Sequence, residues 1–156
     1  MAKIKMTEKG LVAQSERRLH HSVEDVWAML TDNDLLKKWF QELRVGDLRE
    51  GGFMKFDIED VLHEELEITE LINLSVLEFD WFGDEVRFEL HFAEYGCLLL
   101  FKEKVNLITE QTKKDLAGWH VCLDVIQALL DGKSILRETE WEKWHQEYVH
   151  VLDKFI

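Results

Sequence analysis

The middle of the chain alternates between hydrophobic and polar residues. Apolar side chains recur at every second position in residues 54–58, 77–81 and 86–92, and again in 97–105. This period of two is typical of antiparallel strands that have one buried and one solvent-facing side. Turn signals that contain glycine separate several of these segments. The pattern therefore predicts a run of about six antiparallel strands.

The residues before this run predict one more strand and two short helices. Residues 11–19 alternate less regularly, and we place them as a strand at an edge of the sheet. Ser22, with an acidic residue three positions later, is a typical start for a helix over 23–31. A second short helix follows, capped by Asp32 or Asn33. Side-chain caps are expected because the chain has no proline to begin a helix.

Residues 113–130 predict a long helix that is apolar on two sides. One stripe consists of larger side chains and should face the sheet. Its members are Leu116, Trp119, Leu123, Ile126 and Leu130. The opposite side of the helix carries small apolar residues, so a second element of the chain should cover it.

A further helix is predicted at the end of the chain, over residues 138–155. Thr139 and Glu142 have the spacing of a capping box. An aromatic stripe follows this start, made of Trp141, Trp144, Tyr148, Leu152 and Phe155. An apolar stripe of this size is expected to be buried against another surface. Three covers are open: the back of the long helix, the edge of the sheet, or a partner subunit in a homodimer.

Three stretches of the sequence resemble a known superfamily. VEDVWAMLTDNDLLKKWF resembles the opening helix pair of the START-like, or SRPBCC, superfamily, and GDLREGGFMKFDIED is similar to its strand–turn–strand unit. LEFDW, followed later by GWHVCLDVIQALLDG, resembles the branch of activator of Hsp90 ATPase homologue 1-like proteins. The resemblance covers residues 11–132. We expect a single domain over 1–156, with the terminal helix as an addition to this core.

The resemblance implies an α+β helix-grip fold. In this fold a curved antiparallel sheet of about six or seven strands wraps a long C-terminal helix, and a cavity lies between them. Some relatives hold lipids, polyketides, flavonoids or other apolar molecules in that cavity, and others are cyclases or dehydratases. One eukaryotic relative stimulates a chaperone ATPase with the help of an additional domain. Because one fold serves several functions, the fold alone does not decide among them.

Side chains from the sheet, the second short helix and the long helix should line this cavity. The predicted ligand-binding residues are Trp39, Phe40, Met54, Phe56, Ile58, Phe79, Trp81, Phe88, Leu90, Leu99, Phe101, Glu103, Trp119, His120, Leu123 and Gln127. A cavity on the order of several hundred Å³ remains if the sheet curves away from the helix. None remains if these side chains fill the space themselves.

Three polar members of this set each have two interpretations. Glu103 either faces the cavity, where burial would raise its pKa, or reaches solvent at the cavity mouth. His120 either hydrogen-bonds a ligand carbonyl or pairs with Asp124, one helical turn away. Gln127 reaches either a ligand hydroxyl or a solvent or backbone partner.

The sequence contains no recognisable catalytic motif, and its His and Cys spacings do not suit a metal site. No cofactor is expected. We therefore favour the non-catalytic binding of an apolar small molecule, either lipid-like or planar and aromatic. The alternatives are a module that acts on an Hsp90-type chaperone, and a cyclase- or dehydratase-type enzyme that uses Glu103 and His120 as acid and base.

Charge and hydropathy narrow the possible partners and the location. The formal net charge of −13 would repel nucleic acids and anionic membrane surfaces. No apolar run reaches the roughly 18 residues of a membrane span, and no export signal is visible at the start. We therefore expect a cytoplasmic protein in which Cys97 and Cys122 are reduced and buried.

Overall fold

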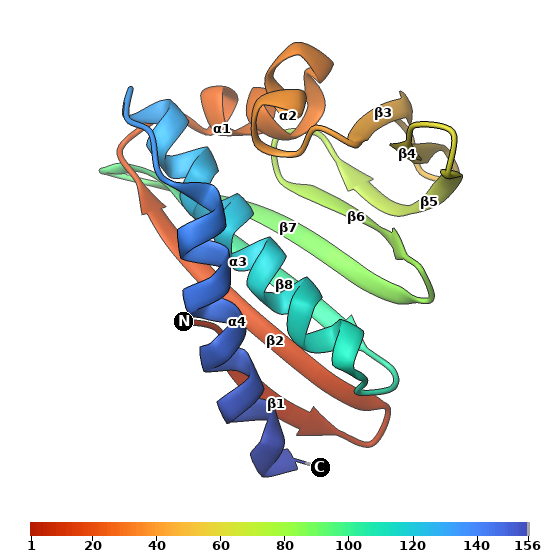
Figure 1. Cartoon of the computed structure of the whole chain (residues 1–156). Helices are drawn as coiled ribbons and strands as arrows, with labels where there is room; N and C mark the ends of the chain where they lie inside the picture. Colours follow the sequence, from red (N-terminus) through yellow and green to blue (C-terminus); the bar gives the residue numbers. More distant parts are fainter. Residues whose placement is uncertain (156) are drawn as a thin grey trace.

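The computed structural model describes residues 1–155, which form one antiparallel sheet with two long helices on one of its faces (Figure 1). The strands are β1 (Lys3–Thr7), β2 (Gly10–Leu19), β3 (Leu43–Asp47), β4 (Phe53–Ile58), β5 (Leu62–Ile72), β6 (Val76–Trp81), β7 (Asp84–Ala93) and β8 (Gly96–Val105). The helices are α1 (Val23–Thr31), α2 (Asn33–Trp39), α3 (Glu110–Leu130) and α4 (Arg137–Leu152), and a 3-10 turn, Asp153–Phe155, follows α4. Among the described residues, no helix is both long and apolar enough to cross a membrane.

The described strands pair in the order β1-β2-β8-β7-β6-β5-β4-β3. The predicted helix-grip α+β fold is confirmed, but the sheet has eight strands where about six or seven are expected. The strand β1 pairs with β2 from Lys3 opposite Gln14 to Thr7 opposite Gly10. The strand β2 therefore lies inside the sheet, and its predicted position at an edge is wrong. The prediction misses β1 because KIKMT, although it alternates, is only five residues long, and these residues are mostly exposed.

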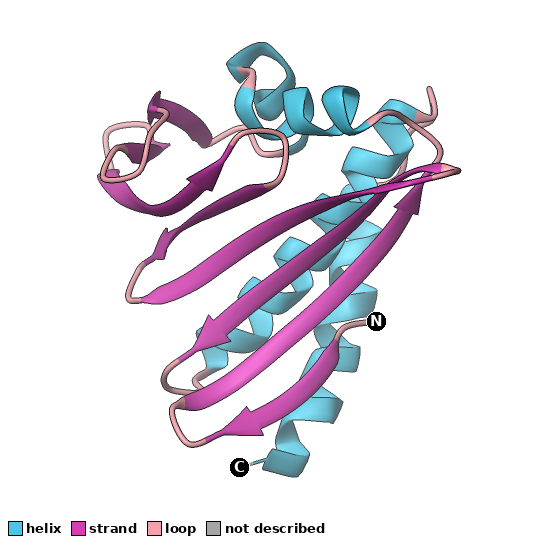
Figure 2. Ribbon diagram, turned by 180° about the vertical axis from the view of Figure 1, so that it is seen from behind, coloured by secondary structure: helices cyan, strands magenta, loops and turns pink. Residues whose placement is uncertain are grey.

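The sheet bends strongly at its β3–β5 end (Figure 2). The strands β2, β8 and β7 run as long neighbours behind the helices, whereas β5, β4 and β3 turn toward α2. The pairing register shifts between Ile68 and Glu70 in β5, and between Val45 and Asp47 in β3. Irregularities of this kind bend a strand and increase its twist. The bend brings β3–β6 and α2 around one end of α3.

The two short helices begin at the predicted caps. The backbone N–H of Asp25 donates to Oγ of Ser22 at 3.1 Å, and Oδ1 of Asp32 accepts from the backbone N–H of Asp34 at 2.9 Å. Of the two candidates for the second cap, the structure thus selects Asp32. Asn33 instead exchanges two hydrogen bonds with the backbone of Val45, at 2.7 and 3.1 Å. This side chain ties the start of α2 to β3.

The long helix α3 begins at Glu110, three residues before the predicted start. Its first turn is closed by the backbone N–H of Thr109, which donates to Oγ1 of Thr112 at 2.9 Å. The predicted stripe of larger side chains does face the sheet: Leu116, Trp119, Leu123 and Ile126 are all buried. Leu130, at the end of the stripe, is half-buried.

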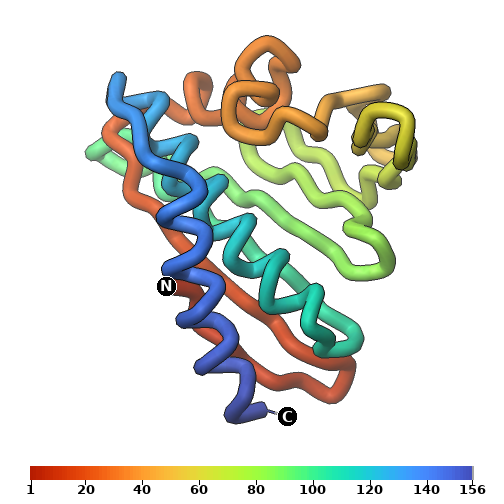
Figure 3. The backbone as a smooth tube through the Cα atoms, viewed as in Figure 1, coloured from red at the N-terminus to blue at the C-terminus, as the bar shows by residue number. Residues whose placement is uncertain are grey.

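The terminal helix α4 packs along the back of α3 (Figure 3). Tyr148 and Leu152 are buried in this contact, and Trp141 and Trp144 are half-buried against both clusters of the core. Phe155 lies 39% exposed beyond the end of the helix. The same stripe also contacts the sheet near its β1 edge, because Tyr148 and Leu152 share a buried cluster with Leu11 and Ala13 of β2. The first two of the three possible covers are therefore used together, and most of the stripe that could have formed a homodimer is covered within the chain.

The start of α4 differs from the prediction. The helix begins at Arg137, after Leu136, and not at a Thr139 cap. Arg137 has a tertiary reason to be helical, because its guanidinium donates to the backbone oxygen of Trp39 at 2.7 Å and lies 3.1 Å from Sγ of Cys122. A contact across nearly a hundred residues outweighs the local capping signal.

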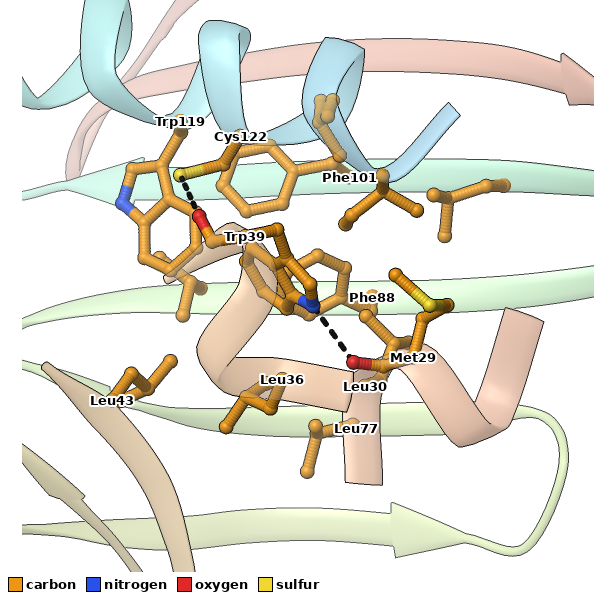
Figure 4. Packing of buried hydrophobic residues seen from close by; sticks show 14 of the residues in the cluster. Met29, Leu30, Leu36, Trp39, Leu43, Leu77, Phe88, Phe101, Trp119 and Cys122 are labelled. Carbon is orange, nitrogen blue, oxygen red and sulfur yellow. Dashed lines mark hydrogen bonds between the residues drawn. The ribbon is translucent and has the colours of Figure 1, made fainter. Parts of the chain in front are cut away.

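Both cysteines are buried free thiols, as the sequence predicts. Burial raises the pKa of the Cys122 thiol to about 11, although the charge of Arg137 opposes that rise. The thiol therefore stays protonated at neutral pH, and it donates to the backbone oxygen of Trp39 at 3.7 Å (Figure 4). Cys122 thus helps to join α2, α3 and the start of α4.

Candidate functional site

An indole ring occupies the centre of the space between the sheet and α3. Trp119 points from α3 toward the sheet and lies among the aromatic side chains shown in Figure 4. Its ring centroid lies 5.0 Å from that of Trp81, 5.1 Å from Phe101, 5.4 Å from Phe40 and 6.0 Å from Phe88. Distances of this size are ordinary aromatic packing contacts. Trp119 therefore fills the region in which the sequence predicts a chamber.

Most of the predicted lining residues belong to this packed core. The buried ones are Trp39, Met54, Phe79, Trp81, Phe88, Leu90, Leu99, Phe101, Trp119 and Leu123. Phe40 and Phe56 are half-buried and pack edge-to-face at 6.0 Å. Ile58 is 39% exposed because it ends β4 and lies outside the sheet–helix space. Gln127 is half-buried on α3.

His120 lies in the interface between α3 and α4. Its Nδ1 is 2.9 Å from the hydroxyl of Tyr148, and its ring stacks on Trp144 with the centroids 3.8 Å apart. Its Nε2 is 3.4 Å from Oδ2 of Asp124, which is the pairing expected from the sequence. Burial, with smaller contributions from nearby positive charges including Arg17, lowers the pKa of His120 to about 3. His120 is therefore neutral at physiological pH and serves the docking of α4.

Glu103 lies on the face of β8 that is turned toward α3, and it is fully buried. Its neighbours in the ladder are Val86 on β7 and Ala13 on β2. Neither carboxyl oxygen has a hydrogen-bond partner in the described residues. Of the two interpretations of Glu103, the one in which it reaches solvent is therefore wrong.

The surroundings of Glu103 hold its carboxyl in the protonated form. Burial raises the pKa of Glu103 well above its ordinary value of 4.5, and the negative charges of Asp115 and Asp84 raise it further. His120 is not among the groups that shift this pKa, because it lies on the α4 side of α3. The pair of groups that an acid–base enzyme would need is therefore not assembled in one place.

A pocket of about 360 Å³ lies beside this carboxyl, between the β6–β7 turn, the segment after β8 and the first turns of α3. We call it the Trp81 pocket. It is lined by Trp81, Phe82, Gly83, Asp84, Asn106, Leu107, Thr109, Gln111, Thr112 and Asp115. Both acids whose charge acts on Glu103 are in this lining. Glu103 itself is fully buried and is not part of the lining.

The rim of the Trp81 pocket exposes large apolar side chains. Phe82 is 48% exposed and Leu107 is 74% exposed. Phe82 has a φ of +52°, which is rare for a bulky residue. The backbone of this turn holds the Phe82 ring against Trp81 and Phe56, with centroids at 5.0 and 5.4 Å. Phe82 is not among the residues predicted from the sequence. The available signal was an aromatic residue directly before Gly83, in a tight turn where a polar residue is usual.

A smaller hollow of about 130 Å³ shares Trp81 and Asp115 with the Trp81 pocket. It continues along α3 past Trp119 to the Cys122–Arg137 contact. Trp81 therefore separates two depressions on the same side of α3. The aromatic core behind it is closed, and the accessible surface lies at its edge.

A larger depression than the Trp81 pocket lies at the opposite end of the sheet. It measures about 540 Å³ and is formed by residues 20–24 and 92–96. One exposed aromatic residue, Phe92, is part of it, at 84% exposure. No buried carboxyl lies against it, and its residues are the tip of the β7–β8 hairpin and the start of α1. We therefore take the Trp81 pocket as the candidate site.

The acids of the candidate site do not form a metal centre. Within residues 1–155, no group of three His, Cys, Asp or Glu side chains is arranged to hold a metal ion. Asp84 accepts a hydrogen bond from the backbone N–H of Asn106 at 3.0 Å, and Asp115 accepts one from Gln111 at 2.9 Å. The Trp81 side chain is a further hydrogen-bond partner of Asp115.

Solved structures share this fold. A conserved protein of unknown function from Enterococcus faecalis, EF2215, is 25% identical, with a TM-score of 0.89 over 99% of this chain and 92% of its own. CalU16 from Micromonospora echinospora is 20% identical, with a TM-score of 0.68 over 97% and 96% of the two chains. The Aha1 dimer from Colwellia psychrerythraea is 22% identical, with a TM-score of 0.65 over 76% and 95%.

The sequence model of one protein family matches most of the chain. That family is described as Activator of Hsp90 ATPase homolog 1-like protein, and its model matches residues 20–131. The matched stretch runs from the end of β2 through α3, so it includes Trp81, Glu103 and Trp119. Comparison with curated proteins gave no match. The chain belongs to the family of activator of Hsp90 ATPase homologue 1-like proteins.

Proposed function

We propose that this protein binds an apolar small molecule in the Trp81 pocket and performs no chemistry on it. The START-like fold to which the family belongs commonly binds hydrophobic ligands. The observation that carries the proposal is Phe82, an aromatic side chain held half-exposed at the pocket rim by a left-handed backbone. An apolar guest would cover this ring and the neighbouring Leu107.

The backbone conformation at Phe82 costs more free energy for phenylalanine than it would for the residues that usually occupy such a turn. A two-residue hairpin turn in which both φ values are positive prefers asparagine or glycine, and here φ is +52° at Phe82 and +93° at Gly83. A bulky residue in this region costs on the order of 1 kcal/mol or more relative to asparagine. Asparagine would therefore suit the backbone better than phenylalanine does. We therefore infer that the phenyl ring is kept at this position for the contacts that it makes.

The volume of the pocket suits a small guest. Ligand pockets measure about 300–1,000 Å³, and the Trp81 pocket has about 360 Å³. Because Trp119 and its aromatic neighbours already fill the space under α3, the guest binds at the edge of the aromatic core. A flat ring system could stack on Trp81 and Phe82 there without displacing Trp119.

The first prediction tests Phe82. Isothermal titration calorimetry with the neutral probe 1-naphthylmethanol should give saturable binding to the natural protein. Phe82→Asn should weaken that binding about tenfold, because a ring contact of this kind contributes roughly 1 kcal/mol or more. Thermal unfolding should show that the variant folds, since asparagine suits the turn.

Phe92→Asn is the matched control, because Phe92 is an exposed phenylalanine at the other end of the sheet. Its affinity for the probe should equal that of the natural protein. If the natural protein gives no saturable heat, or if Phe92→Asn weakens binding while Phe82→Asn does not, the Trp81 pocket is not the binding site.

A further inference from the structure

Three carboxyl groups converge at the Trp81 pocket from three different elements. Asp84 begins β7, Asp115 lies on α3, and Glu103 is buried on β8 and is not part of the lining. They are close enough to influence one another: the charges of Asp115 and Asp84 act on Glu103, and the charge of Asp84 acts on Asp115. Two aspartates and one buried glutamic acid are thus held close together.

No lysine or arginine lies among the residues that line the Trp81 pocket. Lys104 pairs with Glu85 at 3.2 Å, and Lys113 pairs with Glu110 and Asp153, so both are engaged elsewhere. Lys114 lines only the smaller hollow on the other side of Trp81. The acids of the pocket are therefore not neutralised by a neighbouring protein cation, which is unusual for partly buried carboxylates.

Glu103 gives independent evidence that a positively charged group belongs at this site. Its side chain is fully buried, and both oxygens lack a hydrogen-bond partner in the described residues. An unpartnered buried carboxyl costs roughly 1–3 kcal/mol relative to a satisfied one. A positive charge bound beside Asp84 and Asp115, the two acids whose charges act on Glu103, would stabilise the ionised form of this carboxyl.

We propose that the molecule bound in the Trp81 pocket carries a basic nitrogen on an apolar body. The ammonium group lies between Asp84 and Asp115, toward Glu103, and the apolar body covers Trp81 and Phe82. This inference rests on the proposed function and adds the chemical class of the ligand. It accounts for the converging acids, which an uncharged guest would leave unexplained. The half-exposed ring of Phe82, which the apolar body covers, also attracts cations.

The N-terminus of α3, which also lies at the pocket, does not reverse the preference of the pocket for a cation. A helix N-terminus carries the equivalent of about half a positive charge and favours anions. Here Thr112 already closes the first turn, and Glu110 adds a negative charge to it. The two aspartates of the pocket outweigh half a charge of the opposite sign.

Binding of an ammonium group should also ionise Glu103. A nearby positive charge favours the charged form of a carboxyl. The proton of the Glu103 carboxyl then leaves to the buffer, and the charge of the ammonium group stabilises the carboxylate. The groups that face Glu103 are Asp115 from α3 and Asp84 from β7, and its ladder neighbours Val86 and Ala13 carry no charge. Binding of a cation is therefore coupled to the release of a proton.

The second prediction uses three probes that share a naphthalene ring and differ in charge: 1-naphthylmethylamine, 1-naphthylmethanol and 1-naphthoate. Calorimetry at pH 7 should show that the amine binds at least about tenfold more tightly than the alcohol, and that the acid binds most weakly. The natural protein should release protons on binding the amine, measured from the enthalpies in two buffers of different ionisation enthalpy. Glu103→Gln should abolish that release.

Two matched double variants distinguish the effect of the acids in the pocket from the effect of the overall negative charge of the protein. Asp84→Asn with Asp115→Asn should remove the preference for the amine. Glu59→Gln with Glu64→Gln changes the net charge equally at exposed positions and should keep the preference. The inference fails if the amine binds no more tightly than the alcohol, or if both double variants lose the preference equally. If the alcohol binds, the proposed function survives that failure; if no probe binds, the proposed function itself fails.

Discussion

Replacing Trp119 with alanine should lower the free energy of unfolding by about 3–5 kcal/mol. Trp119 is 3% exposed, and its ring contacts four other aromatic side chains, from β6, β7, β8 and the residue that follows α2. Alanine would leave a cavity among these rings, and large rigid neighbours collapse poorly into such a space. A loss of this size is a large part of the total stability of a domain this long.

Urea unfolding followed by circular dichroism measures this loss as a shift of the midpoint at constant slope. Phe92→Ala is the control, because Phe92 is 84% exposed and its truncation should change stability by less than about 0.5 kcal/mol. A loss below about 1 kcal/mol for Trp119→Ala would mean that the space beneath α3 is not filled by this ring in solution.

Replacing Glu103 with leucine should make the protein more stable, by about 1–3 kcal/mol even where the carboxyl is protonated. Leucine has a similar volume and needs no hydrogen-bond partner. The neighbours of this side chain, Val86 and Ala13, are apolar, and Phe101 lies two residues earlier on the same face of β8. The natural carboxyl is retained at a cost to stability, which is what we expect of a group kept for binding.

The stabilisation should grow as the pH rises. The folded-state pKa of Glu103 lies above the unfolded value of about 4.5, so the folded protein binds a proton that the unfolded chain releases. The cost of Glu103 to stability is therefore smallest below pH 4.5 and grows as the pH rises toward the folded-state pKa. Within that window, the difference between Glu103→Leu and the natural protein should widen by about 1.4 kcal/mol per pH unit.

Urea unfolding of both proteins at a series of pH values from 4 to 8 measures this difference, and the other titrating groups cancel in it. Glu64→Gln, at an exposed position, should give a difference that stays near zero throughout. A Glu103→Leu variant that is less stable than the natural protein, or a difference that does not change with pH, would show that this carboxyl has a partner in solution.

The sequence predicts the fold well where the signal is local. The caps at Ser22 and Asp32, the alternation of β6 to β8 and the inward stripe around Trp119 all appear in the structure. It fails where a distant contact decides the outcome. The strand β1 is too short for its alternation to be a clear signal, and it exists because β2 offers a free edge. The helix α4 starts early because Arg137 reaches the backbone of Trp39.

The candidate site was only partly predictable, for a related reason. The alternation of residues along β8 places Glu103 on the face turned toward α3, and helical periodicity places Trp119 on the side turned toward the sheet. Neither pattern gives the size of the space between the sheet and the helix. Trp119 occupies that space itself. The Trp81 pocket depends on the positive φ of Phe82 and on the juxtaposition of the β6–β7 turn with the start of α3. These segments are about thirty residues apart, and only the folded structure shows that they meet.

The central claim is that a ligand binds at the edge of the aromatic core, in the Trp81 pocket. Titration of 15N-labelled protein with 1-naphthylmethanol, followed by 1H–15N correlation spectra, tests it most directly. The account predicts that the shifted signals are those of residues 81–84 and 106–115, including the indole N–H of Trp81. Shifts confined to residues 20–24 and 92–96, where the larger depression lies, would contradict it.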